Sequence, residues 1–468
     1  MIDQAVAAAE SAFEVYSELS PQKVAAFLDR IAEEIAALGD ALIAAASEET
    51  ALTTDRLNGE RTRTLNQLRL FADVARTGEW KDVRIDTALP DRKPVRRPDL
   101  RRTLIPIGPV AVWAASNFPL AFSVAGGDTA SALAAGCPVI LKAHPGHPKT
   151  SVLVAGAIEK AIDACALPQG VFTMVEGASP EISLALVRHP GVKAGAFTGS
   201  LRAGRALFDA AAARPEPIPF FAEMGSVNPV FLLPEGLAER RDAIAEGLAQ
   251  SVNLGVGQFC TCPGLVIGIA GPDFEQFAAQ LRSSFAQSKT GRMLTPAIKA
   301  AYCNAVSRIG AINGVRVTTG TGDGPLPAMF ETSAQTFLAT PDLHHEVFGP
   351  STILIRCDSQ AELEQAARAL EGSLTATVHG TERDLRAHPV LLKILTRKAG
   401  RIIFNGYPTG VEVCAAMQHG GPYPATTDPR FTSVGSAAIA RFARPICYQD
   451  FPPEFLPAEL RLGHSPPF

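Results

Sequence analysis

Val110-Ala111-Val112-Trp113-Ala114 is the first of five short apolar runs between residues 107 and 233, and alanine-rich stretches of helical character separate these runs. The other four are Val139-Ile140-Leu141-Lys142, Val171-Phe172-Thr173-Met174-Val175, Gly195-Ala196-Phe197-Thr198 and Pro219-Phe220-Phe221-Ala222. Strand and helix in regular alternation predict an α/β fold with a doubly wound parallel sheet. Because such sheets bind ligands at the carboxyl ends of their strands, the residues at those ends are candidates for function.

The sequence on either side of this region predicts three further parts. Residues 20–47 predict a helix, because Ser20 suits the N-cap and Pro21 the first helical position, and more helix follows to about residue 77. Residues 79–106 are rich in Arg and Pro and predict an exposed hairpin or arm. Residues 235–430 carry a second mixed set of strands and helices, which predicts a second α/β domain bearing Cys260.

Composition restricts the class of protein. Of the 468 residues, 47% are apolar and 19% charged, and the net charge of −4 is not gathered in long runs, which argues against nucleic acid as a partner. No apolar run reaches the ~18–20 residues that span a bilayer, so we expect a soluble protein without a membrane partner. The eight cysteines are scattered and no secretory signal precedes them, which favours a reducing cytoplasm.

One cysteine stands in an unusual context. The segment Leu254–Gly264 places Cys260 between glycines and a polar turn, where the backbone can approach a ligand and leave amides free for a developing charge. A buried filler cysteine needs no glycine and glutamine before it, so we interpret Cys260 as a reactive thiol. Upstream, Glu223 ends a short apolar strand. A base and a nucleophile are the minimum for covalent catalysis on a carbonyl.

Other polar residues should gather at the same sheet edge. They are Asn117, Lys142, Thr198, Gly199 and Ser200. The Asn117 amide can donate to an oxyanion, although such an asparagine is also a common helix cap. Lys142 needs a ribose or phosphate partner unless it extends to solvent. The glycine turn after Thr198 precedes a helix and suits phosphate, a weak signal by itself.

The sequence predicts no structural metal site. Cys260-Thr261-Cys262 and His344-His345 could suggest ligands. Zinc sites usually require a second matching pair at CxxC or HxxxH spacing, and the sequence has none.

Taken together, the motifs resemble those of the aldehyde dehydrogenase superfamily, in the right order and over nearly the whole chain. They are Ser116-Asn117-Phe118-Pro119, Lys142, Phe197-Thr198-Gly199-Ser200, Glu223-Met224-Gly225, Gly257-Gln258-Phe259-Cys260 and Glu346-Val347-Phe348-Gly349-Pro350. The runs Asn405–Cys414 and His419–Thr426 resemble the branch that contains 2-oxoglutarate semialdehyde (2,5-dioxopentanoate) dehydrogenases and a bacterial NADP-dependent fatty aldehyde dehydrogenase.

The resemblance implies roles for these residues. Cys260 would attack the aldehyde, and the Asn117 amide with the Cys260 backbone N–H would hold the oxyanion. Glu223 would activate the water that hydrolyses the thioester. Glu346 and Phe348 would hold the nicotinamide ribose and ring. Acylating relatives, which pass the thioester to phosphate or coenzyme A, lack this glutamate.

The cofactor implied is NADP, with NAD also possible. Family members that prefer NAD often carry a glutamate three residues after the strand-end lysine, and Pro145 stands there in this chain. No carboxylate therefore repels a 2′-phosphate, and Lys142, His144 and His147 lie nearby in the sequence.

The substrate is expected to be a short oxo-acid semialdehyde. In the family, the helix that contains Arg63 lines the substrate entrance, so Arg63 could bind a distal carboxylate beside Phe118 and Phe259, although a solvated helix face is an equal reading. One alternative is a long aliphatic aldehyde, which needs a dry apolar tunnel. Another is a catalytically silent binding protein of the same fold.

The resemblance also implies an organisation of the chain. We expect a dinucleotide-binding domain over 1–78 and 107–233, a catalytic domain over 234–435, and a small β oligomerisation arm and tail over 79–106 and 436–468, giving a homodimer or homotetramer. The chain starts later than is usual in the family, so either the first strands of the cofactor domain would be absent or the start would be truncated. For His419, a structural role in its Gly-Gly-Pro turn is favoured over tuning of the cysteine or proton transfer.

Overall fold

A five-stranded parallel sheet of order β5-β4-β3-β6-β7 forms the first half of the protein. Its strands are β3 (Val110–Trp113), β4 (Val139–Lys142), β5 (Phe172–Val175), β6 (Ala194–Thr198) and β7 (Phe220–Glu223). The five strands predicted from the apolar runs are confirmed. The order reverses direction between β3 and β6, which makes this the switch point of a doubly wound sheet. The computed structural model describes residues 1–461, so the Pro466-Pro467 end of the expected tail lies outside the described residues.

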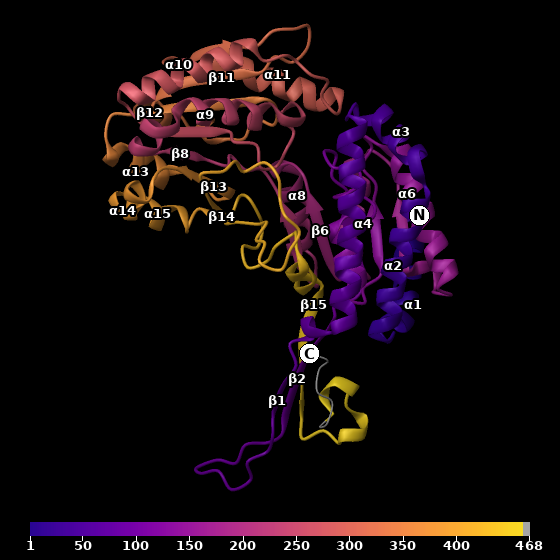
Figure 1. The fold of residues 1–468 in the computed structure, drawn as a ribbon. Coiled ribbons are helices and arrows are strands. Elements are labelled where there is room, and N and C mark those ends of the chain that lie inside the picture. Colours follow the sequence, from indigo (N-terminus) through magenta and orange to yellow (C-terminus); the bar gives the residue numbers. More distant parts are fainter. Residues whose placement is uncertain (462–468) are drawn as a thin grey trace.

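Helices cover this sheet (Figure 1). They are α1 (Ile2–Tyr16), α2 (Pro21–Ala37), α3 (Gly39–Thr50), α4 (Thr54–Thr77), α5 (Gly127–Ala134), α6 (Pro148–Ala164), α7 (Pro180–Arg188) and α8 (Leu201–Ala212). Ser20 caps α2 through its side chain, as predicted. The single helix predicted over residues 20–47 is wrong, because Gly39 adopts a left-handed φ of 57° and divides it into α2 and α3.

A seven-stranded sheet of order β10-β11-β12-β9-β8-β13-β14 forms the second half. Its strands are β8 (Val230–Leu232), β9 (Leu265–Ile269), β10 (Arg316–Thr319), β11 (Ala328–Ser333), β12 (Ser351–Cys357), β13 (Ser373–His379) and β14 (Ala399–Phe404). Only β10 pairs antiparallel. The accompanying helices are α9 (Pro234–Asn253), α10 (Pro272–Gln287), α11 (Pro296–Gly310), α12 (Ala334–Ala339), α13 (Gln360–Ala369), α14 (Glu382–Ala387) and α15 (Pro389–Leu395). The first strand of this sheet, β8, precedes residue 234, where the sequence predicted the catalytic domain to begin.

A three-stranded antiparallel sheet forms an arm that projects from the rest of the molecule (Figure 1). It consists of β1 (Arg84–Asp86), β2 (Leu100–Pro106) and β15 (Ala443–Gln449), with β2 in the middle. The arm predicted over 79–106 is therefore present, and a strand near the end of the chain completes it. Within residues 1–461, no helix is long and apolar enough to cross a membrane.

Asn228 fixes the cysteine loop to the second sheet. Its side chain is fully buried, and its amide Nδ2 donates to the carbonyl oxygens of Cys260 at 2.8 Å and Cys262 at 3.0 Å. Its Oδ1 accepts hydrogen bonds from the hydroxyls of Ser226 and Thr375. The backbone of Asn228 has a left-handed φ of 44°, which asparagine tolerates better than most residues. One side chain thus holds three segments together beside Cys260.

We predict that Asn228→Ala lowers the free energy of unfolding by about 2–4 kcal/mol, because it leaves buried carbonyl and hydroxyl groups without partners. The measurement is the unfolding midpoint in urea together with the thermal midpoint. Asn304→Ala is the matched control, since Asn304 is exposed on α11, and it should change stability by no more than about 0.5 kcal/mol. Equal stability of the two variants would contradict this account.

Candidate active site

The carboxyl ends of the first sheet bring predicted site residues into one row. Lys142 is paired in register with Trp113 of β3, and Thr198 with Glu223 of β7. Since Trp113 also pairs with Phe197, the residue before Thr198, these side chains leave the sheet at nearly the same level. The sheet edge therefore gathers the polar residues as the alternation of strand and helix predicted.

The loop that carries Cys260 is held in an unusual backbone conformation. After α9, the 3-10 turn η3 (Leu254–Gly257) has left-handed φ values of 57° at Gly255, 58° at Val256 and 63° at Gly257. A Cβ atom on Gly257 would lie 2.2 Å from the carbonyl of Gly349, so only glycine fits there. This close approach places the cysteine loop against the segment that contains Glu346 and Phe348.

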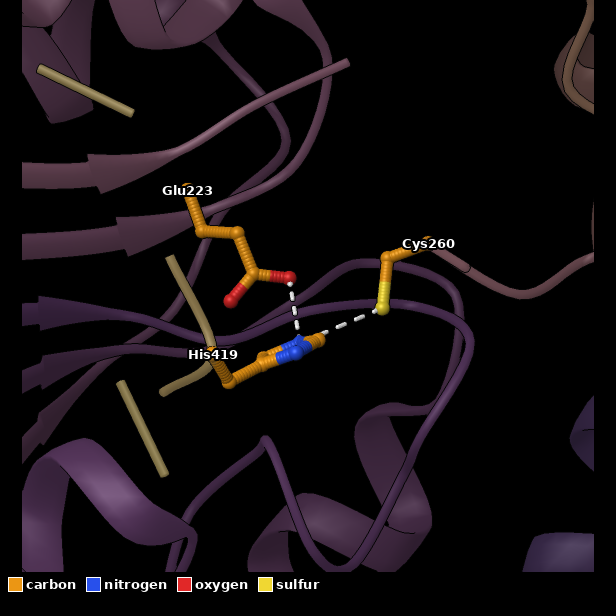
Figure 2. A group of neighbouring side chains, drawn as sticks. All are labelled: Glu223, Cys260 and His419. Atoms are coloured by element: carbon orange, nitrogen blue, oxygen red, sulfur yellow. Dashed lines mark hydrogen bonds and ion pairs between the residues drawn. The ribbon is translucent and has the colours of Figure 1, made fainter. Parts of the chain in front are cut away.

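Cys260, Glu223 and His419 form a tight cluster (Figure 2). The Nε2 atom of His419 lies 3.1 Å from Oε1 of Glu223 and 3.5 Å from Sγ of Cys260. His419 is 1% exposed and Glu223 3% exposed, whereas Cys260 is half-buried. A hydrogen bond of 2.6 Å from the Ser433 hydroxyl occupies the other oxygen of Glu223. The Cys260 thiol and the Glu223 carboxylate therefore both contact the His419 imidazole, and Glu223 is the residue predicted to act as the base.

The chain segment after His419 reaches this position by running along β7. The backbone N–H of Met224 donates to the carbonyl of Ala425 at 2.8 Å, and that of Thr427 donates to the carbonyl of Ala222 at 3.1 Å. The stretch thus covers the open edge of the first sheet and turns His419 inward. Sequence reasoning favoured a structural role for His419, but the structure places its ring in the site. Nothing in the local sequence reveals a contact made over such a separation.

The electrostatics of the cluster keep the carboxylate charged and the thiol protonated. Burial raises the pKa of the Cys260 thiol well above its ordinary value of 9.0, and the negative charge of Glu223 acts in the same direction. Burial also tends to raise the pKa of Glu223, but the charge and hydrogen bond of His419 and the Ser433 hydroxyl outweigh it, so that this pKa is lowered. The thiol therefore needs a proton acceptor before it can act as a nucleophile, and His419 and Glu223 both lie close to it.

Asn117 is held beside the nucleophile. Its amide Nδ2 donates to the backbone carbonyl of Gln258 at 3.1 Å, and the backbone carbonyl of Asn117 accepts a 3.0 Å hydrogen bond from Nη2 of Arg56. An amide nitrogen has two hydrogens, so one remains for a further acceptor. The position agrees with the oxyanion role inferred from the resemblance, since Gln258 is two residues before Cys260.

The residues predicted to bind a cofactor leave polar groups without strong partners. The Lys142 ammonium donates only to the carbonyl of its neighbour Ala143, and burial lowers its pKa against the opposing charge of Glu176. The hydroxyl of Thr198 is buried and has no partner within residues 1–461. Ser200 caps α8, and the Gly199 N–H donates to the carbonyl of Glu223 at 3.0 Å. An ammonium and a free hydroxyl suit the ribose and phosphate groups of a dinucleotide.

Glu346 and Phe348 line a cavity next to the cysteine loop. The cavity is also lined by Ser226, Val227 and Gly257. Burial raises the pKa of Glu346 to about 8, and the negative charge of Glu223 contributes in the same direction. A carboxyl group with this pKa is mainly protonated at neutral pH, so it can both donate and accept hydrogen bonds, which fits the sugar hydroxyls of a nicotinamide nucleotide.

A group of aromatic rings and arginines lies beside Asn117. The rings of Phe118 and Phe259 meet edge to face at 5.5 Å between centroids, and the Arg56 guanidinium lies 4.8 Å and 4.4 Å from them. Arg63 lies over Phe118 at 5.8 Å and Phe122 at 5.3 Å. The three predicted substrate residues, Arg63, Phe118 and Phe259, are thus neighbours.

The guanidinium of Arg63 is not fully satisfied by hydrogen bonds within residues 1–461. Its Nε and Nη2 atoms are buried and have no hydrogen-bond partner in the part of the chain that the structure describes. Burial lowers the pKa of Arg63, and Cys260 is the foremost group that opposes this shift. A solvated helix face, the other reading of the sequence, does not describe these buried nitrogens. Guanidinium N–H groups buried without partners are destabilising unless a ligand supplies an acceptor.

Arg401 was missed as a site residue by sequence reasoning, which treated it only as part of a strand. Its two terminal nitrogens donate to the carbonyls of Gly410 and Pro408, while its Nε is buried without a partner among residues 1–461. Burial lowers the pKa of Arg401, and Cys260 opposes the shift. A second arginine, on β14, thus interacts electrostatically with Cys260.

Comparison with known proteins agrees with this site. The model of the aldehyde dehydrogenase family matches residues 1–423. An alpha-ketoglutaric semialdehyde dehydrogenase 2 of Azospirillum brasilense is 52% identical over 98% of this chain and 89% of its own length. An alpha-ketoglutaric semialdehyde dehydrogenase of Acinetobacter baylyi is 48% identical over 99% of this chain and 89% of its own length.

Solved structures share the fold. A 3,6-anhydro-L-galactose dehydrogenase in complex with NAP aligns over 96% of this chain and 91% of its own, with a TM-score of 0.81 and 21% identity. An NAD+ complex of an aldehyde dehydrogenase from Bacillus cereus aligns over 96% and 88%, with a TM-score of 0.79 and 23% identity. The predicted α/β fold is therefore confirmed. Because the family model matches residues 1–423 and two relatives are 52% and 48% identical to it, the chain belongs to the aldehyde dehydrogenase family.

Proposed function

We propose that this enzyme oxidises 2-oxoglutarate semialdehyde to 2-oxoglutarate through a thioester on Cys260. The choice of substrate rests on Arg63, whose Nε and Nη2 atoms are buried without a partner among residues 1–461 and whose pKa is affected by Cys260. This substrate has a carboxylate at the end opposite the aldehyde, which supplies the missing acceptor. The two relatives named for the same substrate support the choice.

The first step is attack of Cys260 on the aldehyde carbon. The thiol proton passes to Nε2 of the neutral His419 imidazole, 3.5 Å away, and returns to the sulfur when the thioester is cleaved, so Glu223 stays ionised. The sulfur forms a bond to the carbonyl carbon, whose oxygen becomes an oxyanion. The remaining Asn117 amide hydrogen and the Cys260 backbone N–H hold that charge.

The second step completes the oxidation. A bound nicotinamide dinucleotide supplies the acceptor for the hydride of the aldehyde carbon. The thioester left on Cys260 is hydrolysed by water, from which Glu223 removes a proton. The carbon–sulfur bond then breaks, the acid leaves, and the thiol recovers its proton. The low pKa of Glu223 keeps the carboxylate available as this base.

Two arginines would bind the distal end of the substrate. Arg63 offers Nε and Nη2, and Arg401 offers Nε. The 2-oxo and carboxylate oxygens of the semialdehyde are suited to such donors. A long alkyl chain would leave these buried nitrogens unpaired, which is why a fatty aldehyde is the second candidate and not the first.

NADP is the proposed cofactor, with NAD tolerated. Burial lowers the pKa of His144 to about 3, with His147 and Lys142 adding to the shift, so His144 is neutral and Lys142 supplies the cation for a 2′-phosphate. Pro145 is exposed and carries no charge to repel that phosphate. Solved relatives hold NAP or NAD+, which supports a nicotinamide dinucleotide.

The remaining proposals concern organisation. Residues 1–78 and 107–233 would form the dinucleotide-binding domain and 234–435 the catalytic domain. The arm of β1, β2 and β15 has open strand edges suited to pairing with another subunit, so we propose a homodimer or homotetramer. Eight free cysteines, two of them exposed, favour a cytoplasmic location.

The proposed substrate is tested by Arg63→Met. We expect kcat/KM for 2-oxoglutarate semialdehyde to fall about 30- to 100-fold, because a charged hydrogen-bond donor is lost. The value for pentanal, which has no carboxylate, should stay within about threefold. Rates are followed by the absorbance of the reduced nicotinamide.

Arg61→Met is the matched control, because Arg61 lies on the same helix but donates to Gly39 and Asn58. It should leave the selectivity between the two aldehydes unchanged. An equal loss of both activities in Arg63→Met would show that the guanidinium does not bind the carboxylate of the substrate. A wild-type preference for decanal over the semialdehyde would instead establish the fatty aldehyde function.

The electrostatic account of Cys260 is tested by Glu223→Gln. Glu223 raises the pKa of the thiol, so its neutralisation should lower that pKa and move the pH profile of iodoacetamide alkylation, measured without cofactor, to lower pH. At pH 8 the variant should react at Cys260 roughly tenfold faster for each unit of change. Peptide mass spectrometry measures the rate at this residue. Glu239→Gln, at an exposed position, should not shift the profile; an unshifted profile in Glu223→Gln would refute the account.

The cofactor preference is tested by a pair of substitutions. Lys142→Met should reduce kcat/KM for NADP about tenfold more than for NAD, since only NADP carries the 2′-phosphate. Pro145→Glu should also disfavour NADP by repulsion and improve the relative use of NAD. Equal effects on both cofactors would show that neither residue faces the 2′ position.

A further inference from the structure

Three metal-ligating side chains meet at the catalytic cluster. Glu223, Cys260 and His419 each offer one ligand atom, and all three atoms lie within 4.8 Å of one another. We propose that this cluster binds one Zn²⁺ ion reversibly and that the bound ion switches the enzyme off. The ligands come from three distant segments, so the spacing patterns of the sequence could not reveal the site.

Two of the three ligand-to-ligand distances suit a tetrahedral ion, and the third, between Cys260 and Glu223, is no more than 4.8 Å. With bonds of about 2.0–2.3 Å to oxygen, nitrogen and sulfur, the ligand atoms of a zinc site lie roughly 3.3–3.6 Å apart. In the structure, Sγ of Cys260 is 3.5 Å from Nε2 of His419, and that nitrogen is 3.1 Å from Oε1 of Glu223 (Figure 2). Small side-chain movements therefore complete the site, and a fourth position is left for water.

The ligands are already oriented by their neighbours. The Ser433 hydroxyl holds one oxygen of Glu223 and leaves the other facing His419. The backbone N–H of His419 donates to the Thr432 hydroxyl at 2.9 Å, which fixes the turn that carries the ring. Such supporting contacts strengthen metal binding because the ligands lose little freedom when the ion arrives.

Charge favours zinc over the hard cations. A thiolate and a carboxylate neutralise the two positive charges of Zn²⁺, so the complex is neutral in a buried site. Binding displaces the thiol proton to solvent and transfers no electrons. Mg²⁺ and Ca²⁺ prefer oxygen ligands and larger coordination numbers, and this donor set does not suit them.

The affinity should remain below that of a permanent zinc site. Coordination through Nε2 requires the proton of the imidazole on Nδ1, and this buried atom has no acceptor within residues 1–461. An unpaired buried N–H opposes binding. The ion is therefore removable by a chelator, as a reversible inhibitor must be.

The inhibitory effect rests on the nucleophilic role proposed for Cys260, whereas binding of the ion does not. A thiolate bonded to zinc donates electron density to the ion and is therefore a weaker nucleophile toward the aldehyde carbon. Glu223, with its oxygen on the metal, is likewise withdrawn from water activation. One ion thus removes both the nucleophile and the base.

The test measures zinc retention by the full-length enzyme after gel filtration, without cofactor or substrate. Wild-type enzyme should retain one Zn²⁺ per subunit, and the ion should protect Cys260 from iodoacetamide until EDTA is added. His419→Gln and Cys260→Ser should weaken binding about 100-fold or more. Glu223→Gln gives the same information if either variant fails to fold. Mg²⁺ at the same concentration should not protect Cys260.

His189→Gln and Cys447→Ser are matched controls, because these residues lie outside the cluster, and both should bind zinc like the wild type. Retention of the same zinc in His419→Gln and Cys260→Ser would overturn the proposal, as would bound zinc that leaves Cys260 open to alkylation. Activity is measured separately: zinc held by the cluster in a protein that oxidises no aldehyde would refute the proposed function and leave the metal site standing.

Discussion

The buried contact between Glu223 and His419 is the constraint on which the site depends. A carboxylate that is only 3% exposed keeps its charge because an imidazole and the Ser433 hydroxyl face its two oxygens. The same contact fastens the stretch from His419 to Ser433 against β7, and it brings the ring within reach of Cys260. Packing, the ionisation of the base and the state of the thiol are therefore not independent. A substitution of Glu223, His419 or Cys260 therefore changes the protonation of the other two side chains.

Much of the fold follows from local sequence. The five strands of the first sheet were predictable because each is a short apolar run bounded by turn residues and followed by a helix. The ends of these runs also identified Lys142, Thr198 and Glu223, which lie in one row of the sheet. Gly257 belongs to the same class of local signal, because glycine marks the point where the cysteine loop meets Gly349. The break at Gly39 was missed, since one glycine within an amphipathic pattern does not distinguish a kink from a continuous helix.

The rest of the site depends on contacts between distant segments. His419 lies in a turn whose local sequence favours a structural role, and only the pairing of the following residues with β7 turns its ring toward Cys260. Arg56 and Arg401 are ordinary charged residues of a helix and a strand until the fold places them beside Phe259 and near Cys260. For Arg63 the sequence left two readings open, and burial of its nitrogens distinguishes them. Such information is absent from any single stretch of sequence.

The arm has a consequence for how the protein is made. Its central strand, β2, leaves the ribosome long before β15, which follows it in the chain by hundreds of residues. Until residues 443–449 emerge, one side of β2 has no partner from its own chain. An open strand edge is a hazard for aggregation in a nascent polypeptide. The arginines and prolines between β1 and β2 reduce that hazard until β15 pairs with β2.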